Sequence, residues 1–193
     1  GAGGANPDFV ARLAAGDTTA DEQTSPRSVY RNAYVKPGFE SDQEDLWVES
    51  MLTTKTGEGN YPGNSVPSDN WPGFAPGDRG ILNTMAPTYF NTSGIVGLER
   101  KPSVLWIRGV DDAIVSDASF FDLNYLGQVG VIPGWPGEEL APAQPMVSQT
   151  RAVLEAYAAT GGQFREVALE NCGHSPQLEH PDAFDDALLT HIR

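Results

Sequence analysis

Two segments in the second half of the chain predict strands of a parallel sheet. The run from Val104 to Ile107 follows Pro102 without a polar interruption, which is typical of a strand covered on both faces of a parallel sheet. The segment from Gln163 to Glu170 predicts the second strand. Residues 146–160 between them have a helical pattern, as expected for the crossover that joins two parallel strands. This order predicts an α/β fold class.

Helical patterns and one irregular region account for much of the remaining chain. Asn6 is expected to cap the first helix with Pro7 at its first position, and Pro181 is expected to begin the last. Residues 57–80 are rich in glycine and proline and predict a long irregular loop. Helices are expected at about 7–16, 25–34, 41–54, 146–160 and 181–192.

Polar side chains follow directly after both predicted strands. Asp111 and Asp112 follow the first, and Cys172-Gly173-His174 follows the second. The carboxyl ends of parallel strands are where ligands bind in open α/β sheets. A carboxylate that orients a histidine is two thirds of a nucleophilic hydrolase site. Taken singly, Asp112 could be a turn former and His174 a structural histidine; their matching positions favour a catalytic pair.

Longer motifs around these residues resemble a known family. The sequences GVDDAIVSD and NCGHSPQLEHPDAF, in this order and each after a strand, resemble the C-terminal half of the α/β-hydrolase superfamily. The resemblance covers residues 95–193. It implies that Asp112 is the catalytic acid, with Asp111 as the alternative, and that His174 is the general base.

The resemblance also implies a division of the chain into two parts. Residues 1–94 would form a helical cap with an aromatic, Pro/Gly-rich loop, or alternatively a small packing subdomain. Residues 95–193 would be the C-terminal part of the hydrolase core, with a long aromatic loop at 116–145 as a second pocket wall or a surface insertion. Candidate substrate-binding side chains in these regions are Trp71, Tyr89, Phe120 and Trp135.

The nucleophile that such a site needs is not found in the sequence. The family places it in G-x-S-x-G before the acid, and this motif does not occur. Thr92-Ser93-Gly94 lacks the first glycine. We therefore expect the N-terminal half of the hydrolase to be a separate chain that carries the nucleophile and completes the sheet. The start in the Gly/Ala-rich GAGGANPDF suggests cleavage of a precursor into a heterodimer.

Composition narrows the function classes. The net charge of −14, from 12 basic and 26 acidic residues, argues against nucleic acid or an anionic membrane as a partner. The single cysteine excludes an intrachain disulfide and a cysteine-rich metal site. No cofactor is expected, no apolar run is long enough to cross a membrane, and we expect a cytoplasmic protein, with secretion as the alternative.

Three functions remain open. The first is a serine-type hydrolase of ester, lactone or related acyl bonds in an apolar small molecule. The second is an aminopeptidase resembling proline iminopeptidases, in which a cap carboxylate binds the substrate amine; the candidates are Glu40, Asp42, Glu44, Asp45 and Glu49. The third is a non-catalytic binding module with a hydrolase fold.

Overall fold

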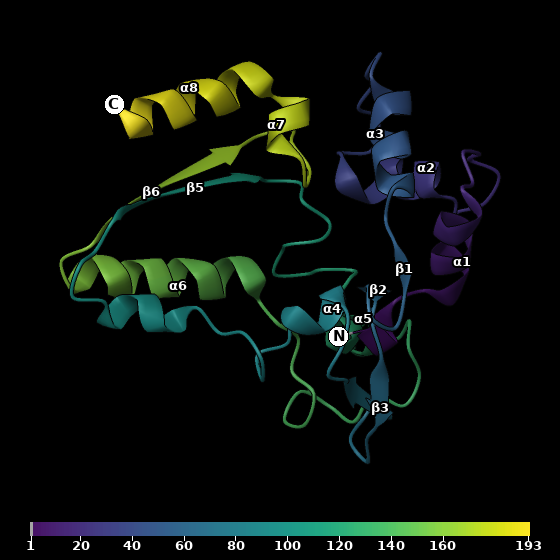
Figure 1. Ribbon diagram of the computed structural model, residues 1–193. Coiled ribbons are helices and arrows are strands. Elements are labelled where there is room, and N and C mark those ends of the chain that lie inside the picture. The colour runs from purple at the N-terminus through teal and green to yellow at the C-terminus, as the bar shows by residue number, and fades with distance from the viewer. Residues whose placement is uncertain (1) are drawn as a thin grey trace. The chain divides into compact units, whose positions relative to one another are not determined.

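The structure is a computed structural model that describes residues 2–193 and belongs to the mixed α/β class (Figure 1). It contains two compact units. The first comprises residues 2–30, 40–91 and 126–142, and the second comprises 31–39, 92–125 and 143–193. This grouping differs from a division between residues 94 and 95. Residues 31–39 belong to the second unit, and residues 126–142 belong to the first.

The second unit is built on two parallel strands. β5 (Ser103–Gly109) pairs with β6 (Gln163–Leu169) so that Ser103 lies opposite Gln163 and Gly109 opposite Leu169. Both strands and their parallel pairing are as predicted from the sequence. Because the pairing is in register, the carboxyl ends of both strands lie at the same edge of the sheet.

Helices lie on both faces of this strand pair (Figure 1). α6 (Met146–Ala159) joins the strands, and Arg151 on α6 reaches Glu166 of β6 and lies over the ring of Trp106 of β5. α8 (Pro181–Ile192) contacts β5 from the other side. α7 (Pro176–Glu179) is a single turn between β6 and α8. Tyr157 on α6 is fully buried.

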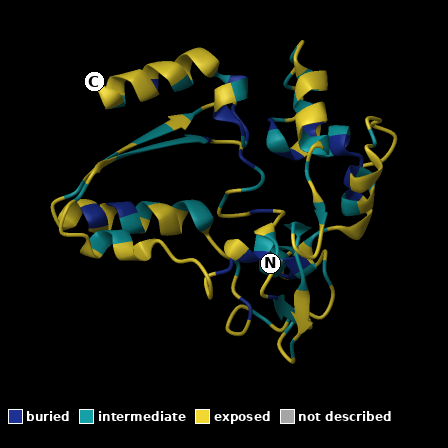
Figure 2. Cartoon of the chain, in the orientation of Figure 1, coloured by how far each residue is buried: buried dark blue, intermediate teal, exposed yellow. Residues whose placement is uncertain are grey.

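The strands are less buried than the sequence predicts. Residues 104–107 of β5 are only half-buried, whereas their apolar run predicts that both faces are covered (Figure 2). The physical reason is the width of the sheet, since within residues 2–193 it has two strands and each strand keeps one unpaired edge. Isolated two-stranded sheets are marginal in water.

The first unit consists of short elements. Its helices are α1 (Pro7–Ala15), α2 (Pro26–Val29), α3 (Glu44–Leu52), α4 (Ile81–Thr84) and a 3₁₀ turn at Ala2–Gly4. Two small strand pairs, β1 (Thr56–Gly57) with β2 (Tyr61–Pro62) and β3 (Ser65–Pro67) with β4 (Phe74–Pro76), lie in the segment predicted to be irregular. Asn6 caps α1 as predicted, accepting hydrogen bonds from the amides of Asp8 and Phe9.

The helix predicted at 25–34 is interrupted. Only α2 is regular, and a π turn follows at Tyr30–Tyr34. Val35, directly after this turn, is buried in the second unit, so tertiary packing decides the course of the chain here. The remaining elements are α5 (Leu123–Gln128), inside the long aromatic segment, and a 3₁₀ helix at Ser93–Gly97. None of the helices within residues 2–193 has the length and apolarity of a membrane span.

Candidate functional site

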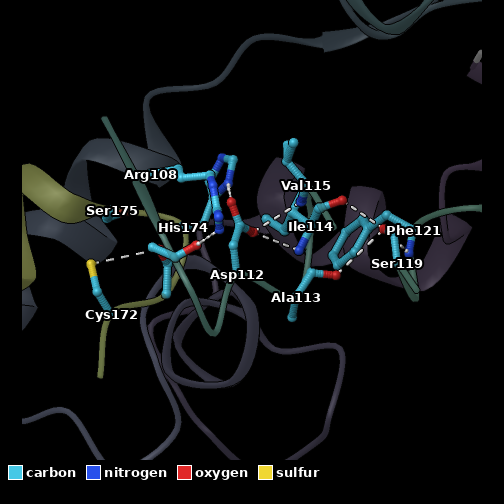
Figure 3. Close-up of polar contacts among 12 residues, drawn as sticks. Arg108, Asp112, Ala113, Ile114, Val115, Ser119, Phe121, Cys172, His174 and Ser175 are labelled. Atoms are coloured by element: carbon cyan, nitrogen blue, oxygen red, sulfur yellow. Dashed lines mark hydrogen bonds and ion pairs between the residues drawn. The ribbon is translucent and has the colours of Figure 1, made fainter. Parts of the chain in front are cut away.

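The turns after β5 and β6 bring Asp112 and His174 together (Figure 3). Oδ2 of Asp112 lies 2.9 Å from Nδ1 of His174, although the two residues are 62 positions apart. The Asp112 side chain is 8% exposed and that of His174 is 32% exposed. An ionised carboxylate can only accept, so we assign the proton to Nδ1, which leaves Nε2 as the basic nitrogen.

Backbone amides hold the Asp112 carboxylate in place. Its Oδ1 accepts hydrogen bonds from the amide of Ile114 at 2.7 Å and that of Val115 at 2.9 Å (Figure 3). Burial opposes ionisation, but the hydrogen bonds from His174 and these two amides outweigh it and lower the pKa of Asp112. Asp112 is therefore a fixed anion at neutral pH, suited to orient an imidazole.

Glu179 anchors the loop that carries His174. This carboxylate is 8% exposed and accepts hydrogen bonds from the amides of Gly173, at 2.9 Å, and Ser175, at 3.2 Å. It also accepts a hydrogen bond from the amide of Lys36 at 2.8 Å. Sequence reasoning assigned no role to Glu179. Its place five residues after His174, within the motif NCGHSPQLEHPDAF, was the only signal in a chain with many acids.

Residues 34–36 pack against the same loop. The ring of Tyr34 makes an edge-to-face contact with His174, with centroids 5.9 Å apart, and burial raises the pKa of Tyr34. Gly173 permits the close approach, because a Cβ there would lie 2.5 Å from the amide nitrogen of Lys36 and 2.8 Å from the carbonyl carbon of Val35. This segment was expected at the end of a cap helix, so its contact with the site was missed.

Two other side chains near the pair, the alternative acid Asp111 and the thiol of Cys172, have different roles. Asp111, the alternative acid, forms an ion pair with Lys36 at 3.0 Å and has no hydrogen bond to His174. Cys172 is completely buried, as expected for a small apolar residue. Burial, and then the nearby carboxylates of Glu179, Asp112 and Asp111, raise the pKa of its thiol to about 12. Cys172 is therefore not a thiolate nucleophile at neutral pH.

The four candidate substrate-binding aromatics do not form one group. Trp71 and Trp135 lie together in the first unit, where a Cβ on Gly127 would be 2.8 Å from atoms of both rings. Tyr89 belongs to the same unit and is 58% exposed. Phe120 belongs to the second unit, is 62% exposed and makes an edge-to-face contact with Tyr125.

The side of His174 that faces away from Asp112 is available for chemistry. Within residues 2–193, no side chain forms a hydrogen bond with Nε2 of His174. Ser93 lies in the 3₁₀ helix ahead of β5 and not on a strand-to-helix turn. Across the same described residues, no group of three or more His, Cys, Asp or Glu could hold a metal ion. An oriented imidazole with a free Nε2 can act as a general base or acid.

Comparisons of the chain with protein-family models, with curated proteins and with solved structures found no match. The chemistry open to this protein is indicated by the geometry at the ends of β5 and β6. There, a buried anionic Asp112, an oriented His174 and an amide-anchored loop form a preorganised acid–base pair.

Proposed function

We propose that this protein is a serine-type hydrolase of ester, lactone or related acyl bonds, with the C-terminal part of an α/β-hydrolase fold. The observation that carries the proposal is the 2.9 Å contact between Asp112 and Nδ1 of His174, with Nε2 left free. The motifs GVDDAIVSD and NCGHSPQLEHPDAF add the family resemblance. Asp112 is the acid and His174 the general base.

Each group has a defined role in the reaction. Asp112 accepts the Nδ1 proton, fixes the tautomer and stabilises the imidazolium when it forms. Nε2 of His174 removes the proton of the attacking hydroxyl, whose oxygen then bonds to the acyl carbon. The imidazolium gives that proton to the departing alkoxide. In the second half, Nε2 takes a proton from water, which attacks the acyl-enzyme, and returns it to the nucleophile's oxygen.

The nucleophile is proposed to come from polypeptide outside these 193 residues, as the N-terminal half of the hydrolase on a separate, cleaved chain. The chain contains no G-x-S-x-G. The unpaired edges of β5 and β6 support this proposal, because the half-buried side chains of residues 104–108 would be covered if further strands extended the sheet. Such a neighbouring strand would also end at the edge where His174 lies.

Residues 1–94 are proposed to act as the cap, with an apolar acyl compound as the substrate. Trp71 and Trp135, whose rings both approach Gly127, support apolar binding. The aminopeptidase alternative gains no support from the cap acids Glu44 and Asp45, since both already form ion pairs with Arg27, at 2.5 and 2.7 Å.

Labelling of the native protein with a fluorophosphonate, followed by intact-mass analysis, tests the proposal. We expect the adduct on a second polypeptide that copurifies with this chain. Asp112→Asn and His174→Gln should slow labelling by about a thousandfold or more. The matched control Asp111→Asn should label within a few fold of the wild-type rate.

Two outcomes would contradict the proposal. An adduct on a preceding segment of one longer chain would refute the two-chain arrangement but retain the catalytic pair. A folded protein without adduct, and without turnover of p-nitrophenyl esters, would favour the non-catalytic binding module.

A further inference from the structure

Lys36 bridges the two turns that carry the catalytic pair. Its ammonium lies 3.0 Å from Oδ2 of Asp111, after β5, and 3.0 Å from Oδ1 of Asn171, after β6. Asn171 has a φ of 54°, in the left-handed region that asparagine tolerates better than most residues. The amide of Asp111 also donates to the carbonyl of Cys172 at 2.9 Å, so the turns are joined twice.

Adjacent carboxylates at the end of β5 have separate partners. Asp112 is buried and bound to His174, whereas Asp111 is 42% exposed and bound to Lys36. Without Lys36, the uncompensated charge of Asp111 would act on His174 together with that of Asp112. A second negative charge favours the imidazolium, and an imidazolium cannot accept a proton from a nucleophile.

We propose that Lys36 is a positioning residue that neutralises Asp111, so that Asp112 is left as the carboxylate that governs the charge and tautomer of His174. The catalytic consequence rests on the proposed hydrolase function, but the electrostatic statement does not. The titratable and charged groups around His174 come from four places: Arg108, Asp111 and Asp112 at the end of β5, Arg31, Tyr34 and Lys36 on residues 31–39, Glu170 and Cys172 after β6, and Glu179 and His180 at α7.

The test is an NMR titration of His174 in the native protein with histidine labelled at Cε1. The chain has three histidines, so His174→Gln assigns the signal. Lys36→Met removes a repelling cation and leaves the charge of Asp111 uncompensated, so the titration midpoint should rise by a few tenths of a pH unit, roughly the effect of one nearby charge in water. Asp111→Asn leaves the charge of Lys36 uncompensated, so the midpoint should fall by a similar amount.

The double variant distinguishes this mechanism from a general loosening of the site. Lys36→Met with Asp111→Asn removes a neutral pair, so the midpoint should return to within about 0.1 pH unit of wild type. Lys36→Arg should keep the wild-type midpoint, and so should the exposed control Lys55→Met in the first unit. Both single shifts should shrink in 1 M NaCl, where charges are screened within about 3 Å.

Shifts of the same sign in both single variants, or no shift in either, would overturn the proposal. So would a double variant that moves as far as Lys36→Met alone. The titration needs no turnover, so it separates the two hypotheses. If the single variants shift in opposite directions but the protein never reacts with the fluorophosphonate, the role of Lys36 is retained and the hydrolase proposal is refuted. If the protein reacts but the shifts are absent, the hydrolase proposal is retained and the role of Lys36 is refuted.

Discussion

Replacement of Glu179 by glutamine tests whether this buried carboxylate holds the His174 loop. Oε1 accepts from the amides of Gly173 and Ser175, and Oε2 accepts from those of Lys36 and Gly173. A glutamine can keep one oxygen toward Gly173 and Ser175. Its NH₂ group would then face the amide of Lys36, so that two donors oppose each other.

The expected loss follows from these contacts. The charge-assisted hydrogen bond from the part-buried amide of Lys36 disappears and leaves that amide without its acceptor, at a cost of about 1.5–3 kcal/mol. We therefore expect Glu179→Gln to lower the free energy of unfolding by about 1.5–3 kcal/mol. Because domains of this size are stable by about 5–15 kcal/mol, the variant should remain folded and measurable.

Urea unfolding measures this change, and hydrogen exchange locates it. With an m-value of about 2 kcal/mol/M, the midpoint should fall by up to about 1.5 M. Exchange should accelerate at the amides of Lys36, Gly173 and Ser175 more than in the strands. The exposed control Glu170→Gln should change stability by less than about 0.5 kcal/mol. If Glu179→Gln behaves like the control, the anchoring role assigned to this carboxylate is wrong.

Two further predictions concern the same loop. Gly109→Ala should destabilise the protein by at least about 2 kcal/mol and break the hydrogen bond between Asp112 and His174, because its Cβ would lie 2.0 Å from the carbonyl oxygen of Gly173. Urea unfolding and the NMR signal of His174 measure these two effects. The control is Gly94→Ala, whose Cβ meets no atom within 4 Å. Cys172 should react with a thiol reagent at pH 8 only after the protein unfolds. Because folding raises the pKa of this thiol to about 12, the free energy of unfolding should decrease as the pH rises above about 8.5, the pKa of an unfolded thiol. Rapid modification of the folded protein would contradict both expectations.

Local sequence patterns predicted the parts of the site that follow regular elements. The apolar run at Val104–Ile107 and the segment at 163–170 specified two parallel strands, and their ends located Asp112 and His174. The N-cap of α1 by Asn6 was also predicted from the sequence, because a capping interaction spans only two or three residues. In each case the deciding contacts are close in sequence or follow from strand geometry.

Only the tertiary structure decided what surrounds the pair. Glu179 and the amide of Lys36 are 143 positions apart, and no periodicity relates them. Whether Asp111 or Asp112 meets His174 depends on the turn after β5, where two adjacent carboxylates point to different partners. Hydrogen bonds from His174 and two backbone amides then lowered the pKa of Asp112 against the effect of burial, and burial raised the pKa of the Cys172 thiol. Local propensity thus determined the elements and the ends of the strands, whereas long-range packing determined which side chains meet there, because their energies depend on neighbours that only folding brings together.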